Sequence, residues 1–410
     1  MVEYNTICIA GPFITVRASQ IQNYVGAKYQ DDLKFPYGND GTHTFFAKDH
    51  QYLKDSLFAA GSQTQIKAHA GSFVKALELY CESVPDVSRK GLPRVLIVIE
   101  ESSDRWTNDY KTIEMELMAN YSVYCMRASF PEIAREARVD PESNILYFRG
   151  KEIGLVYFRA GFEEGPHIVT KAEDLADGLD FWKVREMIEL SMPIKLPSID
   201  FQLATFKKFQ QQFSDRAYLD KVAQSEELVN RLGKVFSTIW SMENLGVEGA
   251  EINEVYKDAI AHPENYYLKP QKEGGGNNLV NDEIRQKLQD LDDPELKTYI
   301  IQKRIVPPLV DTYHCVKGGY YVSQSFIEIG IASSLFTKFN AATESSPATN
   351  VVIDSQMIGM FCKSKDSSVK EAEVCKGTAC LTFPLPIPTA LIQEKSKGLA
   401  KGKLEMTVKI

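Results

Sequence analysis

Residues 94–100, with the sequence RVLIVIE, limit the folds available to this 410-residue chain more than any other segment. The segment is a continuous hydrophobic run and lacks the polar alternation of a strand that has one face in water. Such a run is typical of a strand buried on both faces of a parallel sheet. Because parallel neighbours must be joined by crossovers, usually helices, the segment predicts an α/β fold.

The flanking sequence supports this class with alternating helix and strand patterns. Hydrophobic spacing predicts helices at 71–83, 109–120, 180–192, 251–262 and 281–291, and further helices between 197 and 243. Strands are expected at 2–10, 121–130 and 266–270, as a pair within 144–162, and as several strands between 298 and 362, the middle ones antiparallel. Residues 29–65 follow neither pattern, so we expect a surface insertion there.

The composition argues against several classes of protein. The formal net charge is −8, whereas a nucleic-acid-binding protein normally carries a basic face. No run of about 18 hydrophobic residues is present, so we expect no membrane span. The start, MVEYNTICIAGPF, lacks a basic segment followed by a long hydrophobic run, which predicts no secretion signal and a cytoplasmic location.

The cysteines and histidines give no motif for a disulfide framework or a metal site. The seven cysteines are scattered and form no C-x-x-C pair, so we expect free thiols in a reducing compartment. The six histidines neither pair at helical spacing nor lie beside cysteines. The sequence therefore supports neither a zinc site nor a histidine-based catalytic triad.

The segment LKPQKEGGGNNL, residues 268–279, places cations and a carboxylate beside three consecutive glycines. It is not a Walker P-loop, because no G-K-[ST] follows, and it lacks the G-x-G-x-x-G spacing of a dinucleotide site. Lys269 at a strand end can contact phosphate, glycine amides can approach phosphate oxygens, and Glu273 can hold Mg²⁺. The alternative interpretation is a surface loop with incidental charges.

Two further pairs could belong to such a site. Glu3 and Asn5 lie two residues apart on the strand expected at 2–10, so both side chains would point to one face and offer hard oxygen ligands to Mg²⁺. Lys207 and Lys208 lie on an expected helix. Taken alone, each pair is more typical of a solvated surface.

Six segments occur in the order found in eukaryotic-type glutathione synthetase, and the chain resembles this family from its first residues to about Pro388. They are VEYNTI at 2–7, VYFRAGF at 156–162, QLATFKKFQQ at 202–211, LKPQKEGGGNNL at 268–279, IEIGI at 327–331 and CKSK at 362–365. The resemblance implies an ATP-grasp core of antiparallel sheets with helices, an inserted α/β substrate-binding domain with a mostly parallel sheet, and a homodimer. We expect the first core part at 1–90, the substrate-binding domain at 91–203, and the second core part with its glycine-rich lid at 204–410.

Members of this family join γ-glutamylcysteine to glycine: ATP phosphorylates the cysteine carboxylate, and the amine of glycine attacks the acyl phosphate. The resemblance implies two Mg²⁺ ions held by Glu3, Asn5 and Glu273. It implies catalytic roles for Lys207, Lys269 and Arg159. The implied nucleotide-binding residues are Lys207, Lys269, Glu273, Gly274, Gly275, Gly276, Asn277, Asn278, Gln302, Lys303, Glu328 and Lys365.

The substrate side departs from the family pattern. The implied substrate-binding residues are Arg159, Asp104, Trp106, Tyr110, Lys363, Val374 and Cys375. Phe162 stands where the family has tyrosine, Cys8 and Ala10 where it has serines, and Lys363 where it has arginine. Each change removes a hydrogen-bonding partner or alters its geometry.

Three hypotheses follow from this pattern. The first is an ATP-dependent carboxylate–amine ligase whose donor or acceptor differs from the usual pair, such as a related thiol peptide in place of γ-glutamylcysteine or another small amine in place of glycine. The second is a binding protein that lacks catalytic activity or has acquired a new function. It would be a secreted effector if a signal sequence precedes this chain. The third is an ordinary glutathione synthetase.

Overall fold

The computed structural model describes residues 2–9, 11, 13–18, 20–21, 63–86, 89–100, 107–162, 180–223, 225–272, 276–316, 319–340, 349–370 and 379–382. The chain divides into two compact units that alternate along the sequence. Unit 1 contains Met1–Ile9, Pro93–Asp104 and Cys125–Pro307, and unit 2 contains Ala10–Leu92, Arg105–Tyr124 and Pro308–Ile410. The domain limits expected from the sequence stay predictions.

Unit 1 contains a six-stranded, mostly parallel sheet, as the hydrophobic run predicts. Its strands are β1 (Arg94–Val98), β2 (Cys125–Ala128), β3 (Ala137–Val139), β4 (Leu146–Phe148), β5 (Lys151–Phe158) and β6 (Ile194–Leu196). β1 lies between β2 and β5 and runs parallel to both, and β6 is parallel to β5. The expected strand pair at 144–162 is the antiparallel hairpin β4–β5, and β3 pairs with β4.

Helices α5 (Phe130–Glu136) and α7 (Phe181–Leu190) pack on this sheet. Phe130, Phe181 and Ile188 are buried in one hydrophobic cluster with Leu96 and Val98 of β1. α7 begins where the Asp180 carboxylate accepts hydrogen bonds from the main-chain N–H groups of the first helical turn. Val95 and Ile97 of β1 are also buried, which confirms a strand with both faces covered.

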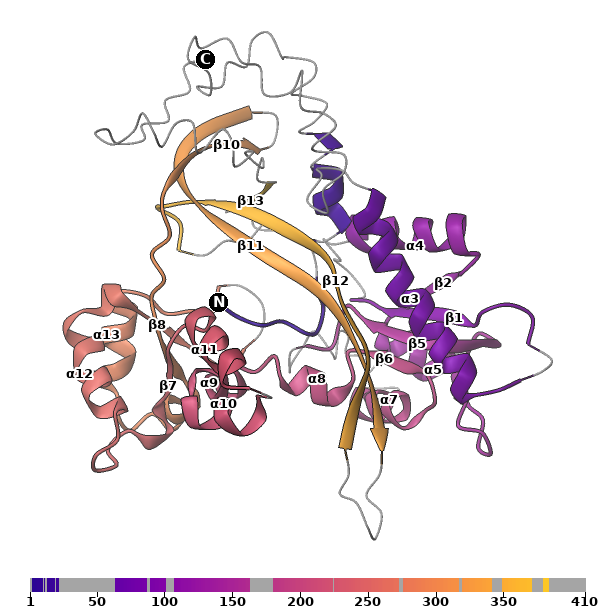
Figure 1. Ribbon diagram of the computed structural model, residues 1–410, viewed down its shortest axis with the longest axis horizontal. Helices are drawn as coiled ribbons and strands as arrows, with labels where there is room; N and C mark the ends of the chain where they lie inside the picture. The colour runs from indigo at the N-terminus through magenta and orange to yellow at the C-terminus, as the bar shows by residue number, and fades with distance from the viewer. Residues whose placement is uncertain are drawn as a thin grey trace. The chain divides into compact units, whose positions relative to one another are not determined.

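In residues 199–303 of unit 1, short helices alternate with the strands of a three-stranded sheet. The helices are α8 (Ile199–Leu203), α9 (Lys207–Gln211), η1 (Gln212–Ser214), α10 (Arg216–Val222), α11 (Glu226–Val235), η2 (Met242–Asn244), α12 (Ile252–Ala261), η3 (Pro263–Asn265), α13 (Asp282–Gln289) and η4 (Pro294–Thr298). The sheet order is β7 (Ile239–Ser241), β9 (Ile300–Lys303), β8 (Tyr266–Lys269). α12 and α13 lie side by side and bury Ala259 and Leu288 with Leu268 and Ile301 of the sheet (Figure 1).

The strand expected at 2–10 is not formed, which corrects the prediction. Residues 2–9 belong to neither a helix nor a strand. The main chain of Tyr4 bonds instead to the side-chain amide of Gln210, and the carbonyl of Val2 accepts from Gln302 Nε2 at 3.1 Å. Side-chain amides therefore replace the neighbouring strand that β-branched residues led us to expect.

Unit 2 contains a four-stranded antiparallel sheet, as expected for the last third of the chain. The order is β10 (Val310–Val316), β11 (Gly319–Asn340), β12 (Thr349–Asp366), β13 (Ala379–Thr382). β11 and β12 form one long ribbon (Figure 1). Gly330 lies opposite Phe361 in this ribbon, and a Cβ at position 330 would lie 2.1 Å from the Phe361 ring, so the ring occupies the space that the glycine leaves.

Helices α3 (Gln63–Ser83) and α4 (Thr107–Tyr121) pack on one another, and α3 also packs on β12. A Cβ at Gly359 of β12 would lie 2.5 Å from Gln65 Cγ and 2.8 Å from His69 Cε1. The glycine therefore allows α3 to approach the strand closely. The insertion expected at 29–65 lies outside the described residues, apart from its end at the start of α3.

Asp109 of α4 is fully buried and bonds to the beginning of the chain within unit 2. Its carboxylate accepts from the main-chain N–H groups of Gly11, Phe13 and Ile14 at 3.2, 3.1 and 2.9 Å. Residues 13–18 are helical, so the carboxylate caps the N-terminus of this helix. Among the described residues, no helix combines the length and hydrophobicity needed to span a bilayer.

Candidate functional site

Lys207 and Lys269 come from different elements of unit 1 and are both buried. Lys269 is the last residue of β8 and is 4% exposed, and Lys207 is the first residue of α9 and is 8% exposed. Lys207 Nζ donates to the carbonyl of Lys272 at 2.6 Å, and the main-chain N–H of Lys208 donates to Gln271 Oε1 at 2.9 Å. The start of α9 therefore lies against the segment that leads into the glycine loop.

The two ends of the glycine loop are fixed to one another. Leu268 and Leu279 form a two-way bridge, with N–H···O distances of 3.1 and 2.8 Å. Asn277 and Asn278 are half-buried just before it, and Gly276 has φ 91°, a value that L-residues rarely adopt. Glu273, Gly274 and Gly275 lie outside the described residues, so the predicted third metal ligand and two of the glycines stay predictions.

Glu3 and Asn5 lie on one face of the N-terminal segment, as their spacing predicts. Asn5 Nδ2 donates to Glu3 Oε1 at 3.0 Å, and both residues are exposed. A half-turn of the Asn5 amide would place its oxygen beside the Glu3 carboxylate. Hard oxygen donors on an accessible face suit Mg²⁺, which keeps several waters and takes few protein ligands. These residues fit the ion.

No cluster of three or more His, Cys, Asp or Glu side chains close enough to hold a metal is found within the described part of the chain. The Glu3–Asn5 pair is a partial donor set that would need a further ligand, the role predicted for Glu273.

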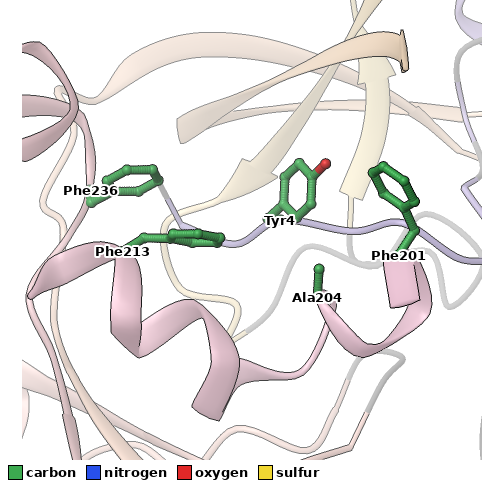
Figure 2. A pocket seen from close by; sticks show the side chains of 5 residues that line it. All are labelled: Tyr4, Phe201, Ala204, Phe213 and Phe236. Carbon is green, nitrogen blue, oxygen red and sulfur yellow. The ribbon is translucent and has the colours of Figure 1, made fainter. Parts of the chain in front are cut away.

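Tyr4 lies between these two residues in sequence and lines an apolar pocket of about 370 Å³ in unit 1. Phe201, Ala204, Phe213 and Phe236 form the rest of the lining (Figure 2). Phe213 and Phe236 are stacked, with ring centroids 5.4 Å apart. Burial raises the pKa of the Tyr4 hydroxyl above its usual value. The sequence did not reveal this pocket, because its rings come from four separate segments.

Arg159 follows β5 at the carboxyl end of the parallel strands, the edge at which α/β sheets bind ligands. Its side chain is buried, and Nη1 donates to the carbonyl of Ile9 at 2.5 Å. The Tyr157 hydroxyl donates to the same carbonyl at 3.2 Å. Arg159 therefore fixes the main chain beside Cys8, whereas the sequence predicted that it would contact a substrate carboxylate.

The departures from the family pattern at positions 8 and 162 lie in this region. Cys8 has φ 53°, and both Cys8 and Phe162 pack half-buried against the hydrophobic core of the parallel sheet. Cys8, Cys81, Cys125, Cys362 and Cys380 are free thiols, as expected. Burial raises the pKa of Cys362 to about 12, so this thiol stays protonated at neutral pH.

The predicted adenine-side residues differ in burial. Gln302 is 2% exposed and donates to the carbonyl of Val2, whereas Lys303 is exposed at the end of β9. In this structure the Gln302 amide therefore supports the N-terminal segment. No local sequence pattern indicates that contact, because Val2 and Gln302 are 300 residues apart in sequence.

In unit 2 the structure brings together three predicted residues. Glu328 and Lys363 are directly opposite on β11 and β12, with Lys363 Nζ 2.7 Å from Glu328 Oε1. Lys365 lies two residues further along β12, over the Phe326 ring, and donates to the carbonyl of Lys370 at 3.1 Å. Glu328, Lys363 and Lys365 therefore share one face of the ribbon.

The other predicted substrate residues give less support to a substrate role. Tyr110 is 1% exposed, and its hydroxyl is 3.1 Å from Thr107 Oγ1. That ring is a core residue of α4. Asp104, Trp106, Val374 and Cys375 lie outside the described residues.

Residues 1–385 match the family described as "Eukaryotic glutathione synthase, ATP binding domain". The chain is 31% identical to a glutathione synthetase of Dictyostelium discoideum over 294 residues, which are 71% of this chain and 57% of that protein. It is 29% identical to a human glutathione synthetase over 80% of this chain and 62% of that protein. The chain thus spans less than two thirds of the length of these curated relatives.

A solved structure of a glutathione synthetase-like effector from Globodera pallida, in its apo form, has a similar fold. The TM-score is 0.59 at 17% sequence identity, and the match covers 94% of this chain and 70% of that one. The expected resemblance is therefore confirmed, and so is the expected α/β fold class with a mostly parallel sheet and an antiparallel sheet.

Proposed function

Because the chain belongs to the eukaryotic glutathione synthase family, we propose that it is an ATP-dependent carboxylate–amine ligase. The donor would be γ-glutamylcysteine or a related thiol peptide, and the acceptor would be glycine or another small amine. ATP would phosphorylate the donor carboxylate, and the amine would then displace phosphate from the acyl phosphate to form the amide. We also infer a cytoplasmic homodimer from the family.

The observation that carries the proposal is the pair of buried lysines at the glycine loop. Lys207 and Lys269 are nine-tenths buried, and unit 1 also carries Glu3 and Asn5 on one accessible face. The two lysines come from different elements, α9 and β8, beside the same loop. They would contact a triphosphate as point charges and orient it.

The metal-binding residues would have a different role from the lysines. Glu3 and Asn5, together with Glu273, would hold two Mg²⁺ ions, which when bound would neutralise charge on the β- and γ-phosphates. The roles of Glu273, Gly274, Gly275, Glu328 and Lys365 rest on the family resemblance alone.

A second candidate function is a binding protein with an altered substrate site. Two observations favour it. Tyr110 is buried, and Lys363 forms an ion pair with Glu328, so residues predicted to bind a ligand contact other residues of this chain instead. The loss of several hydrogen bonds, each worth about 1–3 kcal/mol, would prevent useful binding of the usual donor.

The test is release of ADP from Mg·ATP in the presence of γ-glutamylcysteine and glycine, repeated with other thiol peptides and amines. Turnover with any donor and acceptor pair supports the ligase, and the pair identifies the substrates. Stabilisation by Mg·ATP in a thermal melt without turnover supports the binding protein. A melting temperature that Mg·ATP leaves unchanged would refute both.

A further inference from the structure

The side chain of Gln210 makes three hydrogen bonds, which join it to the segment that carries Glu3 and Asn5 and to the turn beside it. Gln210 is 4% exposed. Its Oε1 accepts from the N–H of Tyr4 at 3.0 Å, and its Nε2 donates to the carbonyl of Tyr4 at 2.8 Å and to that of Thr205 at 2.7 Å. One amide thus has two donor hydrogens and one acceptor oxygen engaged.

This contact fixes the orientation of the neighbouring side chains. Bonding to both the N–H and the carbonyl of Tyr4 holds this residue as a neighbouring strand would. One hydrogen bond each also holds residues 2 and 6 of this segment. Gln302 Nε2 donates to the carbonyl of Val2, and Thr6 Oγ1 donates to the carbonyl of Phe201 at 2.6 Å. Residues 2, 4 and 6 are therefore held, and the side chains of Glu3 and Asn5 lie between the held positions.

Gln210 also connects this segment to the lysine at the glycine loop. Lys207 and Gln210 are three residues apart in α9, so they share one helix face, and both are buried. Lys207 contacts the carbonyl of Lys272 while Gln210 contacts Tyr4. A single helical turn therefore fixes both a predicted phosphate contact and the segment with two predicted metal ligands.

We infer that Gln210 is a positioning residue that sets the metal affinity of the nucleotide site by holding Glu3 and Asn5 in place. This inference rests on the proposed function, because it presumes that Mg²⁺ and ATP bind at these residues. Groups that orient metal ligands typically change metal affinity by about 10–100-fold when they are removed.

The experiment is a Mg²⁺ titration of the full chain at fixed ATP, with the melting temperature as the readout. Gln210→Met keeps the side-chain volume but removes all three hydrogen bonds. Gln210→Glu keeps the acceptor for Tyr4 but places oxygen against two carbonyls. We expect the Mg²⁺ concentration at half-maximal stabilisation to rise about 10–100-fold in both variants.

Gln211→Ala is the matched control, because this neighbouring glutamine makes no side-chain hydrogen bond to the described residues. Its Mg²⁺ midpoint should equal that of the wild type. If Gln210→Met does not fold, Thr6→Val removes a smaller support, and a rise of its midpoint by a few-fold would support the inference.

The outcomes separate the inference from the proposed function. A Gln210 variant that melts at a lower temperature without ligand but keeps the wild-type Mg²⁺ midpoint would show a purely structural role and overturn the inference alone. An unchanged midpoint in Thr6→Val would overturn it in the same way. A wild type that Mg·ATP fails to stabilise would overturn the inference together with the proposed function.

Discussion

The predicted ligand-binding lysines are held in two different ways in the two units. In unit 1, Lys207 and Lys269 are at most 8% exposed, and the ammonium of Lys207 contacts a main-chain carbonyl. In unit 2, Lys363 pairs with the carboxylate of Glu328, and the two side chains are 20% and 37% exposed. One region offers buried cations on regular elements, whereas the other contains a cation and an anion that partly neutralise one another.

This difference indicates which of the predicted ligand-binding lysines can be substituted without loss of nucleotide binding. A main-chain carbonyl stays in place whatever side chains surround it, so the contact of Lys207 depends on the fold itself. The pair in unit 2 depends on two side chains on a half-exposed ribbon, where ion pairs contribute little free energy. We therefore expect unit 1 to determine whether a nucleotide binds and unit 2 to adjust what else binds.

The largest effect should come from the lysines of unit 1. Lys207→Ala and Lys269→Ala should each weaken ATP binding by about 100-fold, because hydrogen bonds to charged groups contribute up to about 3 kcal/mol. The measurement is ATP-dependent thermal stabilisation. Lys208→Ala is the control, since Lys208 is more exposed and pairs with Glu243 at 2.6 Å. Equal loss in all three variants would contradict the distinction between buried and exposed lysines.

A buried titratable group in unit 2 extends the comparison to a side chain outside the predicted site. Burial lowers the pKa of His69 from 6.5 to about 4, although its Nδ1 contacts the carbonyl of Gln65 at 2.8 Å. The unfolded chain therefore binds a proton first as the pH falls, so stability is lost between about pH 6.5 and about pH 4 and is unaffected by this residue above that range.

The expected loss between about pH 7 and about pH 5 is roughly 2 kcal/mol of unfolding free energy. His69→Asn keeps a donor for the Gln65 carbonyl and removes the titration. Urea unfolding at both pH values should therefore show a shallower pH dependence in the variant than in the wild type. Identical pH dependence in the two proteins would show that His69 does not titrate in this way.

The contact between α3 and β12 tests packing in unit 2 without changing a charge. Gly359→Ala should destabilise the protein by about 1–2 kcal/mol, because the new methyl group would overlap Gln65 and His69. Gly233→Ala in α11 is the opposite control, since a Cβ there meets no atom within 4 Å and alanine favours the helix. Urea unfolding of the two variants should give changes of opposite sign, and changes of the same sign would refute this account.

The smallest effect should come from the ion pair of unit 2. A double-mutant cycle with Glu328→Gln and Lys363→Met should give a coupling free energy of about 0.2–1 kcal/mol, as found for partly exposed pairs. The measurement is again urea unfolding of the wild type, both single variants and the double variant. A coupling free energy well above this range would mean that the pair is as strongly fixed as the lysines of unit 1, and the comparison would fail.

The sequence predicted those helices and strands whose hydrophobic pattern is contained in one continuous segment. Residues 94–100 predicted a buried parallel strand because a strand covered on both faces must be hydrophobic throughout. The hairpin β4–β5 and helices α3, α4, α7, α12 and α13 also follow from local periodicity. The family resemblance correctly indicated the fold class because its motifs come from six separate segments in a fixed order.

Features that depend on side chains far apart in sequence could not be predicted. The segment 2–10 has the composition of a strand, but its partners are the amides of Gln210 and Gln302. Arg159 bonds to the carbonyl of Ile9, 150 residues away in sequence, a contact that no local pattern indicates, and its predicted substrate role stays a prediction. Only Gln210 had a usable signal, namely a polar residue three positions after Lys207 and therefore on the same helical face.

The hydrogen bonds that hold residues 2 and 4 have a consequence for the synthesis and folding of the chain. Tyr4 and Gln210 are 206 residues apart in sequence, and Val2 and Gln302 are 300 residues apart. A ribosome therefore releases Glu3 and Asn5 long before their supports exist, and closing such long loops is slow. Until Gln302 has been synthesised, its hydrogen bond to the carbonyl of Val2 cannot form, so the segment that carries Glu3 and Asn5 reaches its final conformation late.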